Sequence, residues 1–375
     1  MKILHVTNTL EEGGVESLLL GLTIGMQKQG HEVTVLSLRP GKTSFCNRFR
    51  QANIHVHSCG AKKRLYSLSK MYRVVRVLLK NDFDIVHAHL FPSQYYVAIA
   101  AIVCGQWKRR RIAIGTTEHG MINSRRTKPW LRGLERMIYR QFDFIVGVSS
   151  TVSENLMRWL GKPMPIVTIE NGIDISTFRA IPSQARVQVR ERLGISESLK
   201  VLIMVARFYE AKDHDTLIRA MALLSPDYHL ILVGSGPTQA NCEMLAKELE
   251  VAERVHFIGY TDLVAEFIAA ADVGVLSSYH EGCPMSLVEY MVYGLPIVAS
   301  DIESIRLLVG DAGYLFPAGN AEELAQCVTR LTIDSEHYNQ MRQISYTRAD
   351  SFELTRTVQK YLQLYTNTAP LCKNN

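Results

Sequence analysis

The regular spacing of short apolar runs constrains the fold of this chain more than any other feature. Twelve runs read as strands, and helical patterns lie between them. Strands that alternate with helices indicate parallel sheets with right-handed crossovers. Twelve strands are too many for one comfortable sheet. The sequence therefore predicts the α/β class with two doubly wound domains. The predicted strands are Lys2–Thr7, His31–Leu38, Ile54–Ser58, Asp84–His89, Arg111–Thr117, Phe142–Ser149, Ile166–Glu170, Lys200–Ala206, Tyr228–Gly234, Val255–Gly259, Val273–Ser277 and Pro296–Ser300, and the predicted helices include Val15–Gln29, Leu65–Lys80, Asp213–Leu224 and Pro237–Leu249.

The length of 375 residues also suggests more than one domain. We place a first Rossmann-like domain at residues 1–172, a linker at 173–197, where Pro182 and Ser183 interrupt the pattern, and a second domain at 198–350. Residues 351–375 are expected to form a final helix, Phe352–Tyr365, and a loose tail from Ala369. Two such domains are expected to face each other across a cleft. Open α/β sheets bind ligands beyond the carboxyl ends of their strands, so this cleft is the expected ligand site.

Cysteine usage and hydropathy bear on the compartment. The seven cysteines occur singly and in odd number, which disfavours a disulfide framework or a zinc cluster and favours a reducing compartment. Polar residues interrupt the N-terminus before a signal peptide could form. The longest uncharged stretch, Leu90–Trp107, has too short an apolar centre for a membrane span. We expect a cytoplasmic protein, soluble or peripheral on the membrane.

The net charge of +6 is divided unevenly along the chain. Residues 1–180 carry 26 lysines and arginines against 12 aspartates and glutamates, whereas residues 181–375 carry 16 against 24. A basic first half is expected to meet an anionic surface or substrate. Nucleic acid is not expected, because no zinc finger or RNP-like aromatic signature is present. The cations cluster at Lys62–Arg64, Lys108–Arg111 and Arg125–Lys128, and again at Arg132, Arg136 and Arg140.

The last cluster overlaps an apolar pattern. Leu131, Leu134, Ile138 and Phe142 recur at helical spacing, with Pro129 near the start, which predicts a basic amphipathic helix. Such a helix either rests on an anionic membrane or packs its apolar stripe on its own domain. The sequence leaves both open.

Two glycine-rich turns bear on whether the chain has a dinucleotide-binding site. The turn after the first strand contains Gly13-Gly14, and Gly234-Ser235-Gly236 follows a later strand, but neither completes G-x-G-x-x-G. An NAD or FAD enzyme is therefore disfavoured.

The segment Glu281–Glu289 holds the densest cluster of chemical groups. Pro284 is suited to open a helix, which places Glu281 in the approaching loop and Glu289 on the helix. Backbone amides in the segment from Cys283 through Pro284 to Ser286 would then form an anion site. The amides come from Cys283, Met285 and Ser286. The two carboxylates could act as a hydrolase pair or could accept hydrogen bonds from sugar or ribose hydroxyls.

A second cluster follows the strand Lys200–Ala206. Arg207 and Lys212 are five residues apart at the carboxyl end of that strand, where two cations can straddle a diphosphate.

These clusters, in this order, resemble the retaining glycosyltransferases of the GT-B fold, family 4, over nearly the whole chain. Arg207 and Lys212 match the R-x4-K motif of that family, and Glu281 and Glu289 match its E-x7-E motif. Further similar segments are Gly13–Glu16, Glu118-His119-Gly120, Asn171-Gly172-Ile173-Asp174, Gly234-Ser235-Gly236-Pro237 and Tyr290–Val298.

The resemblance implies roles for these residues. Arg207 and Lys212 would neutralise the leaving diphosphate, Glu281 would contact hydroxyls of the donor sugar, and Glu289 would hold the ribose. His119 would touch the donor sugar near its reacting face. The implied catalytic residues are thus His119, Arg207, Lys212 and Glu281, and the implied donor-binding residues are Gly14, Arg207, Lys212, Glu281, Cys283, Pro284, Met285, Ser286 and Glu289.

Some positions depart from the family pattern or stay outside the implied site. Cys283 stands where an aromatic residue is common, and Ala206 and Asp213 stand where glycine is common. We do not interpret Cys283 as a nucleophile. His87 and His89 end a predicted strand, and we interpret both as structural.

The resemblance implies a glycosyltransferase that moves a sugar from a nucleotide-diphosphate sugar, a UDP-sugar above others, to a saccharide or lipid-linked saccharide in cell-surface polysaccharide biosynthesis. It implies retention of anomeric configuration. Because placed cations and a helix N-terminus can stabilise the leaving diphosphate, and no DxD-like pair is placed to bind a metal, we expect no cofactor or metal. From the uneven charge of the two halves we also expect the first domain to bind the acceptor and to rest on an anionic membrane. A GT-B-fold nucleotide-sugar epimerase is the alternative enzyme, and a non-catalytic nucleotide-sugar-binding protein is a third reading.

Overall fold

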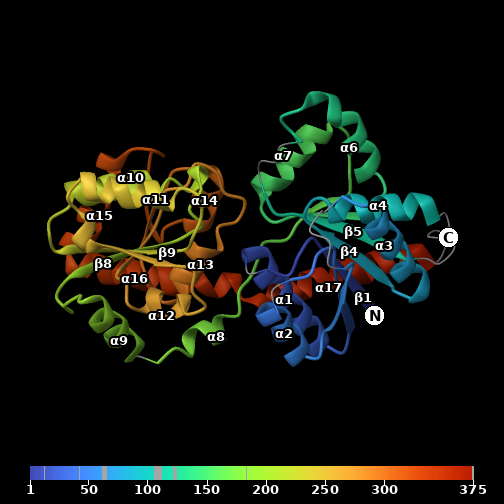
Figure 1. Ribbon diagram of the computed structural model, residues 1–375, viewed down its shortest axis with the longest axis horizontal. Coiled ribbons are helices and arrows are strands. Elements are labelled where there is room, and N and C mark those ends of the chain that lie inside the picture. Colours follow the sequence, from blue (N-terminus) through green and yellow to red (C-terminus); the bar gives the residue numbers. More distant parts are fainter. Residues whose placement is uncertain are drawn as a thin grey trace. The chain divides into compact units, whose positions relative to one another are not determined.

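A computed structural model describes residues 1–11, 13–41, 43–60, 66–104, 112–120, 125–182 and 184–373 (Figure 1). The basic clusters Lys62–Arg64 and Lys108–Arg111 lie outside these residues. The chain forms two compact units. The first unit consists of residues 1–172 and 354–375, and the second unit of residues 173–353. Each is described by itself.

The first unit is built on a parallel sheet of seven strands in the order β3-β2-β1-β4-β5-β6-β7. The direction of strand succession reverses between β1 and β4, which is the topological switch point of a doubly wound sheet. The strands are β1 (Lys2–Thr7), β2 (Glu32–Ser37), β3 (His55–Ser58), β4 (Ile85–His89), β5 (Ala113–Glu118), β6 (Phe144–Gly147) and β7 (Ile166–Thr168), and the helices are α1 (Gly14–Lys28), α2 (Thr43–Gln51), α3 (Leu68–Lys80), α4 (Ser93–Cys104), η1 (Pro129–Leu131), α6 (Arg132–Tyr139), α7 (Ser150–Leu160) and α17 (Leu354–Lys373).

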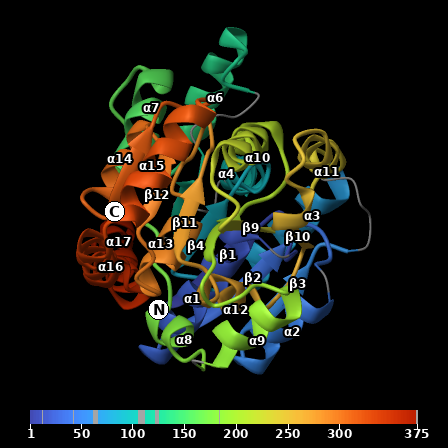
Figure 2. The same ribbon diagram turned by 90° about the vertical axis from the view of Figure 1, so that its left-hand side faces the viewer.

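The second unit repeats this topology with six parallel strands in the order β10-β9-β8-β11-β12-β13. Figures 1 and 2 show α10 and α11 on one face of the sheet and α12 and α13 on the other. The strands are β8 (Lys200–Val205), β9 (Tyr228–Val233), β10 (Val255–Gly259), β11 (Val273–Leu276), β12 (Ile297–Ser300) and β13 (Gly313–Phe316), and the helices are α8 (Ile175–Arg179), α9 (Gln184–Leu193), η2 (Glu210–Lys212), α10 (His214–Leu223), α11 (Gln239–Glu248), η3 (Ala252–Arg254), α12 (Val264–Ala269), α13 (Met285–Val292), α14 (Glu303–Val309), α15 (Ala321–Ile333), α16 (Ser335–Ala349) and η4 (Asp350–Phe352).

The prediction of two doubly wound α/β domains is confirmed, because both sheets are parallel and each is interleaved with helices. The expected count of twelve strands is wrong, since the described residues contain a thirteenth, β13. This strand lies at the sheet edge, and its apolar run Tyr314–Phe316 is short and bounded by Gly313 and Pro317, two residue types that are depleted in strands. A Cβ on Gly313 would lie 2.0 Å from the carbonyl oxygen of Ile297, so glycine permits the pairing with β12.

The end of the chain returns to the first unit as α17, drawn in red beside α1 in Figure 1. Val358 and Leu354 of α17 pack on Gly25 and Gly21 of α1, where an added Cβ would meet these side chains at 2.6 and 2.7 Å. The prediction of a loose tail from Ala369 is wrong for residues 369–373, which continue the helix. Residues 173–197, read from sequence as a linker, contain α8 and α9 and belong to the second unit.

Candidate active site

The two charged motifs of the second unit meet at its topological switch point. Arg207 and Lys212 follow β8, and Glu281 follows β11. These strands are parallel neighbours from which the sheet extends in opposite directions, so their carboxyl ends flank the crevice where ligands bind in open α/β sheets. The sheet topology therefore brings together residues about seventy positions apart in sequence.

A partly buried ion pair joins the two motifs. Lys212 Nζ donates to Glu281 Oε1 at 2.5 Å, and the carboxylate side chain is only 9% exposed. Ser278 Oγ donates to the same oxygen at 2.7 Å, and Ser304 Oγ donates to the Glu281 carbonyl at 2.9 Å. Glu281 is thus held at fixed orientation, which suits a carboxylate that must meet specific hydroxyls.

The turn that carries Lys212 is fixed by the neighbouring strand. Ser277 Oγ donates to the carbonyl of Asp213 at 2.7 Å, and the Tyr279 amide donates to the carbonyl of Ala211 at 2.9 Å. Asp213 has φ +50°, a left-handed conformation in which glycine is usual and Asp is among the better tolerated side chains. Its carboxylate caps α10 by accepting from the Thr216 amide. This explains how Asp213 replaces the glycine common in the family.

Arg207 lies on a loop supported by the glycine turn after β9. A Cβ on Gly234 would lie 2.0 Å from the carbonyl oxygen of Ala206, and one on Gly236 would lie 2.2 Å from that of Phe208. The Phe208 amide donates to the Ser235 carbonyl at 3.1 Å. The two glycines therefore allow this turn to pack against the backbone on both sides of Arg207, whose own side chain is exposed.

Helix α13 begins at Met285, after Pro284, as the sequence predicts. Its first-turn amides, with no preceding helical carbonyl to bind, supply the partial positive charge of a helix N-terminus beside Cys283, Met285 and Ser286. Glu289 lies on this helix, and burial raises the pKa of its carboxyl to about 7. Among the described residues no hydrogen bond or neighbouring charge adds to this effect of burial.

Tyr290 is a residue of this site that our sequence analysis assigned no role. Its buried hydroxyl accepts a 2.6 Å hydrogen bond from the Val205 amide, which ties α13 to the end of β8 just before Arg207. The ring packs over Gly274, where a Cβ would lie 2.3 Å from a ring carbon. A glycine within a strand was the available signal, but its partner could not be identified from sequence.

The first unit holds the other two predicted site residues. Gly14 is the first residue of α1, and an added Cβ there would meet nothing within 4 Å. His119 follows β5, and its Nε2 lies 3.3 Å from Nδ1 of His89 at the end of β4. Glu118 is fixed by Arg126 at 2.9 Å, by Gln94 at 2.7 Å and by the Tyr139 hydroxyl.

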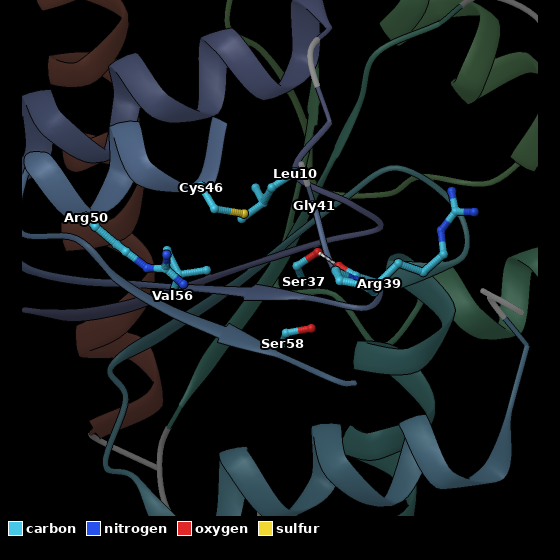
Figure 3. Close-up of a pocket in the computed structure, with 9 residues that line it drawn as sticks. Leu10, Ser37, Arg39, Gly41, Cys46, Arg50, Val56 and Ser58 are labelled. Atoms are coloured by element: carbon cyan, nitrogen blue, oxygen red, sulfur yellow. Dashed lines mark hydrogen bonds between the residues drawn. The ribbon is translucent and has the colours of Figure 1, made fainter. Parts of the chain in front are cut away.

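A cavity of about 160 Å³ lies at the carboxyl ends of the first strands of this unit (Figure 3). Arg50 is directed toward Val56 on one side, whereas Arg39 points away from the other lining residues. Ser37 and Ser58 add hydroxyls to the wall.

The predicted basic helix exists as η1 and α6, and its apolar side chains divide between the core and the surface. Ile138 and Phe142 are buried in the core, whereas Trp130, Leu134 and Met137 are 76%, 42% and 51% exposed. Arg132 and Arg136 are engaged, because they donate to the carbonyls of Trp159 and Leu160 at the end of α7. Of the helices described, none is both long and apolar enough to cross a membrane.

Comparison with known proteins gives matches along both units. Residues 186–348 match the family model described as Glycosyl transferases group 1, and residues 12–177 match the one described as Glycosyltransferase Family 4. The N-acetyl-alpha-D-glucosaminyl L-malate synthase of Bacillus anthracis is 28% identical over 359 residues, 92% of this chain and 92% of that protein. The phosphatidyl-myo-inositol mannosyltransferase of Mycobacterium leprae is 27% identical over 334 residues, 85% of this chain and 83% of that protein.

Among solved structures, that of Anabaena HepE in complex with UDP and glucose superposes with a TM-score of 0.86 at 21% identity, covering 98% of this chain and 100% of that one. This likeness confirms the predicted GT-B fold.

Proposed function

We propose a function for this chain, which belongs to glycosyltransferase family 4 and is a glycosyltransferase. It transfers a sugar from a UDP-sugar to a saccharide or lipid-linked saccharide in cell-surface polysaccharide biosynthesis. The transfer retains the anomeric configuration of the sugar. The observation that carries the proposal is the Lys212–Glu281 ion pair at the switch point of the second unit. It puts a cation for the diphosphate beside a carboxylate for sugar hydroxyls.

The chemistry follows from charge. When the bond between the anomeric carbon and the diphosphate breaks, negative charge grows on the leaving oxygens. Arg207, Lys212 and the N-terminus of α13 supply fixed positive charge for them, while Glu289 accepts hydrogen bonds from the ribose. The acceptor hydroxyl attacks the anomeric carbon, and its proton passes to the leaving phosphate.

The relatives support the choice of donor and acceptor class without deciding them. HepE is named in complex with UDP and glucose, and the mycobacterial relative is named for mannosyl transfer to phosphatidyl-myo-inositol. The epimerase alternative gains no support from these relatives, so we retain transfer.

The test is calorimetric titration with UDP, GDP and ADP, followed by incubation with the corresponding sugar nucleotides. UDP should bind best, and R207A, K212A and E289A should each weaken it by about tenfold or more, the usual effect of losing a charged hydrogen bond. The matched control is R219A, an exposed arginine on α10. Unchanged UDP affinity in all three variants would refute the diphosphate clamp, and an epimerised sugar nucleotide without acceptor would refute transfer.

We further propose that turnover needs no divalent metal, since protein cations neutralise the diphosphate. Activity should survive EDTA within about twofold, and NMR of the product should show the anomeric configuration of the donor. Loss of activity in EDTA with recovery on Mg²⁺, or an inverted product, would contradict these two points separately.

We also propose that the first unit binds the acceptor and rests on an anionic membrane at its cytoplasmic face through Trp130, Leu134 and Met137. These side chains are exposed on a strongly basic unit, a composition typical of interfacial helices. Wild-type protein should float with vesicles containing anionic lipid but not with neutral vesicles, and W130A/L134A should float less. Exposed Leu223 of the second unit provides the control variant L223A. Equal flotation of all proteins would count against the proposal.

A further inference from the structure

Three histidines of the first unit form a continuous row into its core. His119 Nε2 lies 3.3 Å from His89 Nδ1, and His89 Nε2 lies 2.9 Å from His5 Nδ1. They come from the segment after β5, the end of β4 and the middle of β1, which are successive neighbours around the switch point. His5 is completely buried and His89 is 1% exposed, whereas His119 is half-buried.

The row has two ends without partners. His5 Nε2 and His119 Nδ1 are buried nitrogens with no hydrogen-bond partner among the described residues. Burial lowers the pKa of His5 to about 3 and that of His119 to about 4, and it lowers the pKa of His89 well below its ordinary value. Each imidazole is therefore neutral near pH 7 and carries one N–H.

A row of neutral imidazoles has only two hydrogen-bonding arrangements. In one, each ring donates toward His119, which leaves a bare lone pair on His5 Nε2 and an N–H on His119 Nδ1. In the other, each ring donates toward His5, which leaves an N–H without an acceptor in the dry core. Each arrangement leaves one N–H and one lone pair without a partner among the described residues, and a buried N–H without an acceptor is the rarer of the two in proteins. The first arrangement puts that N–H on His119, a residue that is only partly buried, whereas the second puts it on His5, which is completely buried.

We propose that His5 and His89 are positioning residues that fix His119 as its Nδ1–H tautomer, ready to donate to an oxygen of the bound donor sugar. This inference rests on the proposed function of His119. Neither His5 nor His89 is assigned contact with the donor. Each acts through the ring above it, because the hydrogen bond at one imidazole nitrogen decides which nitrogen carries the proton.

His87 shows that an ordinary core histidine of this unit is bonded differently. Its Nδ1 lies 2.5 Å from the Tyr365 hydroxyl and its Nε2 lies 2.8 Å from Thr117 Oγ1, so both nitrogens have hydroxyl partners outside the row. It stacks on His89 at 4.3 Å between ring centroids and shares the same burial. His87 therefore provides a matched control for substitutions in this core.

The nitrogen atoms of His5, His87 and His89 are also close enough together to consider a metal site. The observed contacts favour the hydrogen-bonded row, because His5 Nδ1 and His89 Nε2 are paired with each other and His87 is satisfied by hydroxyls. Metal binding by His5, His87 and His89 is therefore one of the outcomes that the test distinguishes.

The first experiment is ¹⁵N NMR of the full chain labelled at histidine, with assignments from single substitutions. We expect His5, His89 and His119 to be protonated at Nδ1 in the wild type. In H5L the donor to His89 is lost, and the Nδ1–H signal of His119 should weaken in favour of Nε2–H. In H5N the amide can still donate from nearly the same place, so the wild-type pattern should be retained, as it should in H87N.

The second experiment uses UDP-glucose as the probe and measures release of UDP. H5L should lower kcat by at least about tenfold, as loss of an orienting partner commonly does, while H5N and H87N stay near wild type. The Kd for UDP, which lacks the sugar, should be unchanged in all of them. If wild-type protein does not bind UDP, the proposed function is contradicted. The NMR result still shows whether the three histidines are hydrogen-bonded in the proposed arrangement.

Three results would overturn the inference while leaving the proposed function standing. They are a wild-type His119 protonated at Nε2, an H5L protein with an unchanged His119 tautomer, and one equivalent of metal in purified enzyme that is lost in H5L.

Discussion

Glu289 is a residue whose chemistry is set by its surroundings. Its carboxyl lies on helix α13, and burial disfavours the charged form, so its pKa rises to about 7. Two ribose hydroxyls would donate to the carboxylate better than to the neutral acid, which has less acceptor capacity. Donor binding should therefore be coupled to loss of a proton from this residue.

The expected result is a pH-dependent affinity for UDP-glucose. The Kd should improve by about tenfold from pH 6 to pH 8, because protonation of a group with pKa near 7 competes with binding below that value. UDP-glucose is the appropriate ligand because its diphosphate diester does not titrate in this range. Calorimetry of E289Q supplies the control, in which binding is weaker but nearly flat with pH. An equal slope in E289Q would assign the proton to another group.

At the scale of elements, the turn between β8 and α10 shows how one residue can serve two neighbouring structures. Asp213 closes the Lys212 turn in a left-handed conformation and caps the helix that follows. The carbonyl of Asp213 also accepts from Ser277 Oγ, so the turn is tied to the end of β11. The position of Lys212 thus depends on local backbone geometry as well as on its ion pair.

We expect D213A to lower the free energy of unfolding by about 2 kcal/mol, combining loss of the cap with a left-handed alanine. D213G should lie within about 1 kcal/mol of wild type, because glycine adopts φ +50° readily and is a tolerable cap. Urea unfolding of both variants measures the difference. If D213A proves as stable as D213G, the left-handed conformation has little energetic weight here.

At the scale of the whole molecule, buried histidines link stability to pH in both units, and the second unit contributes His214, whose pKa burial lowers to about 4. The row His5, His89 and His119, together with His87, lies in the first unit, and all four have pKa values lowered by burial. In the unfolded chain these groups bind protons below about pH 6.5, while the folded unit resists protonation. Stability of the first unit is therefore full above that pH and falls as the pH drops toward the folded pKa values.

The sequence offers a selective probe of this effect, because all three tryptophans, Trp107, Trp130 and Trp159, belong to the first unit. Between pH 7.5 and pH 5, His5 alone should cost this unit about 2 kcal/mol, from its folded pKa of about 3. Tryptophan fluorescence in urea should shift to lower midpoint at pH 5, and H5N should shift less. A fluorescence midpoint independent of pH would contradict this.

Much of the fold could be predicted from sequence, because apolar runs and helical patterns are local properties of the chain. The central strands β1 and β8 were placed from such runs, whereas the apolar run of the edge strand β13 is short and lies between Gly313 and Pro317, which are depleted in strands. The return of α17 to the first unit depends on glycines of α1 that face it, and no local pattern reports such a contact. Likewise, only the packing separates exposed Leu134 from buried Ile138 on α6.

For the site, the sequence alone determined which charged residues stand at the ends of which strands, since motif spacing and strand order are both encoded along the chain. The roles of Arg207, Lys212, Glu281 and Glu289 remain predictions. Tertiary structure decided which of these groups touch and what supports them, as in the Lys212–Glu281 pair and the Tyr290 hydroxyl on the Val205 amide. It also decided the histidine row, because side chains on β1, on β4 and just after β5 become neighbours only when parallel pairing sets the register of these strands.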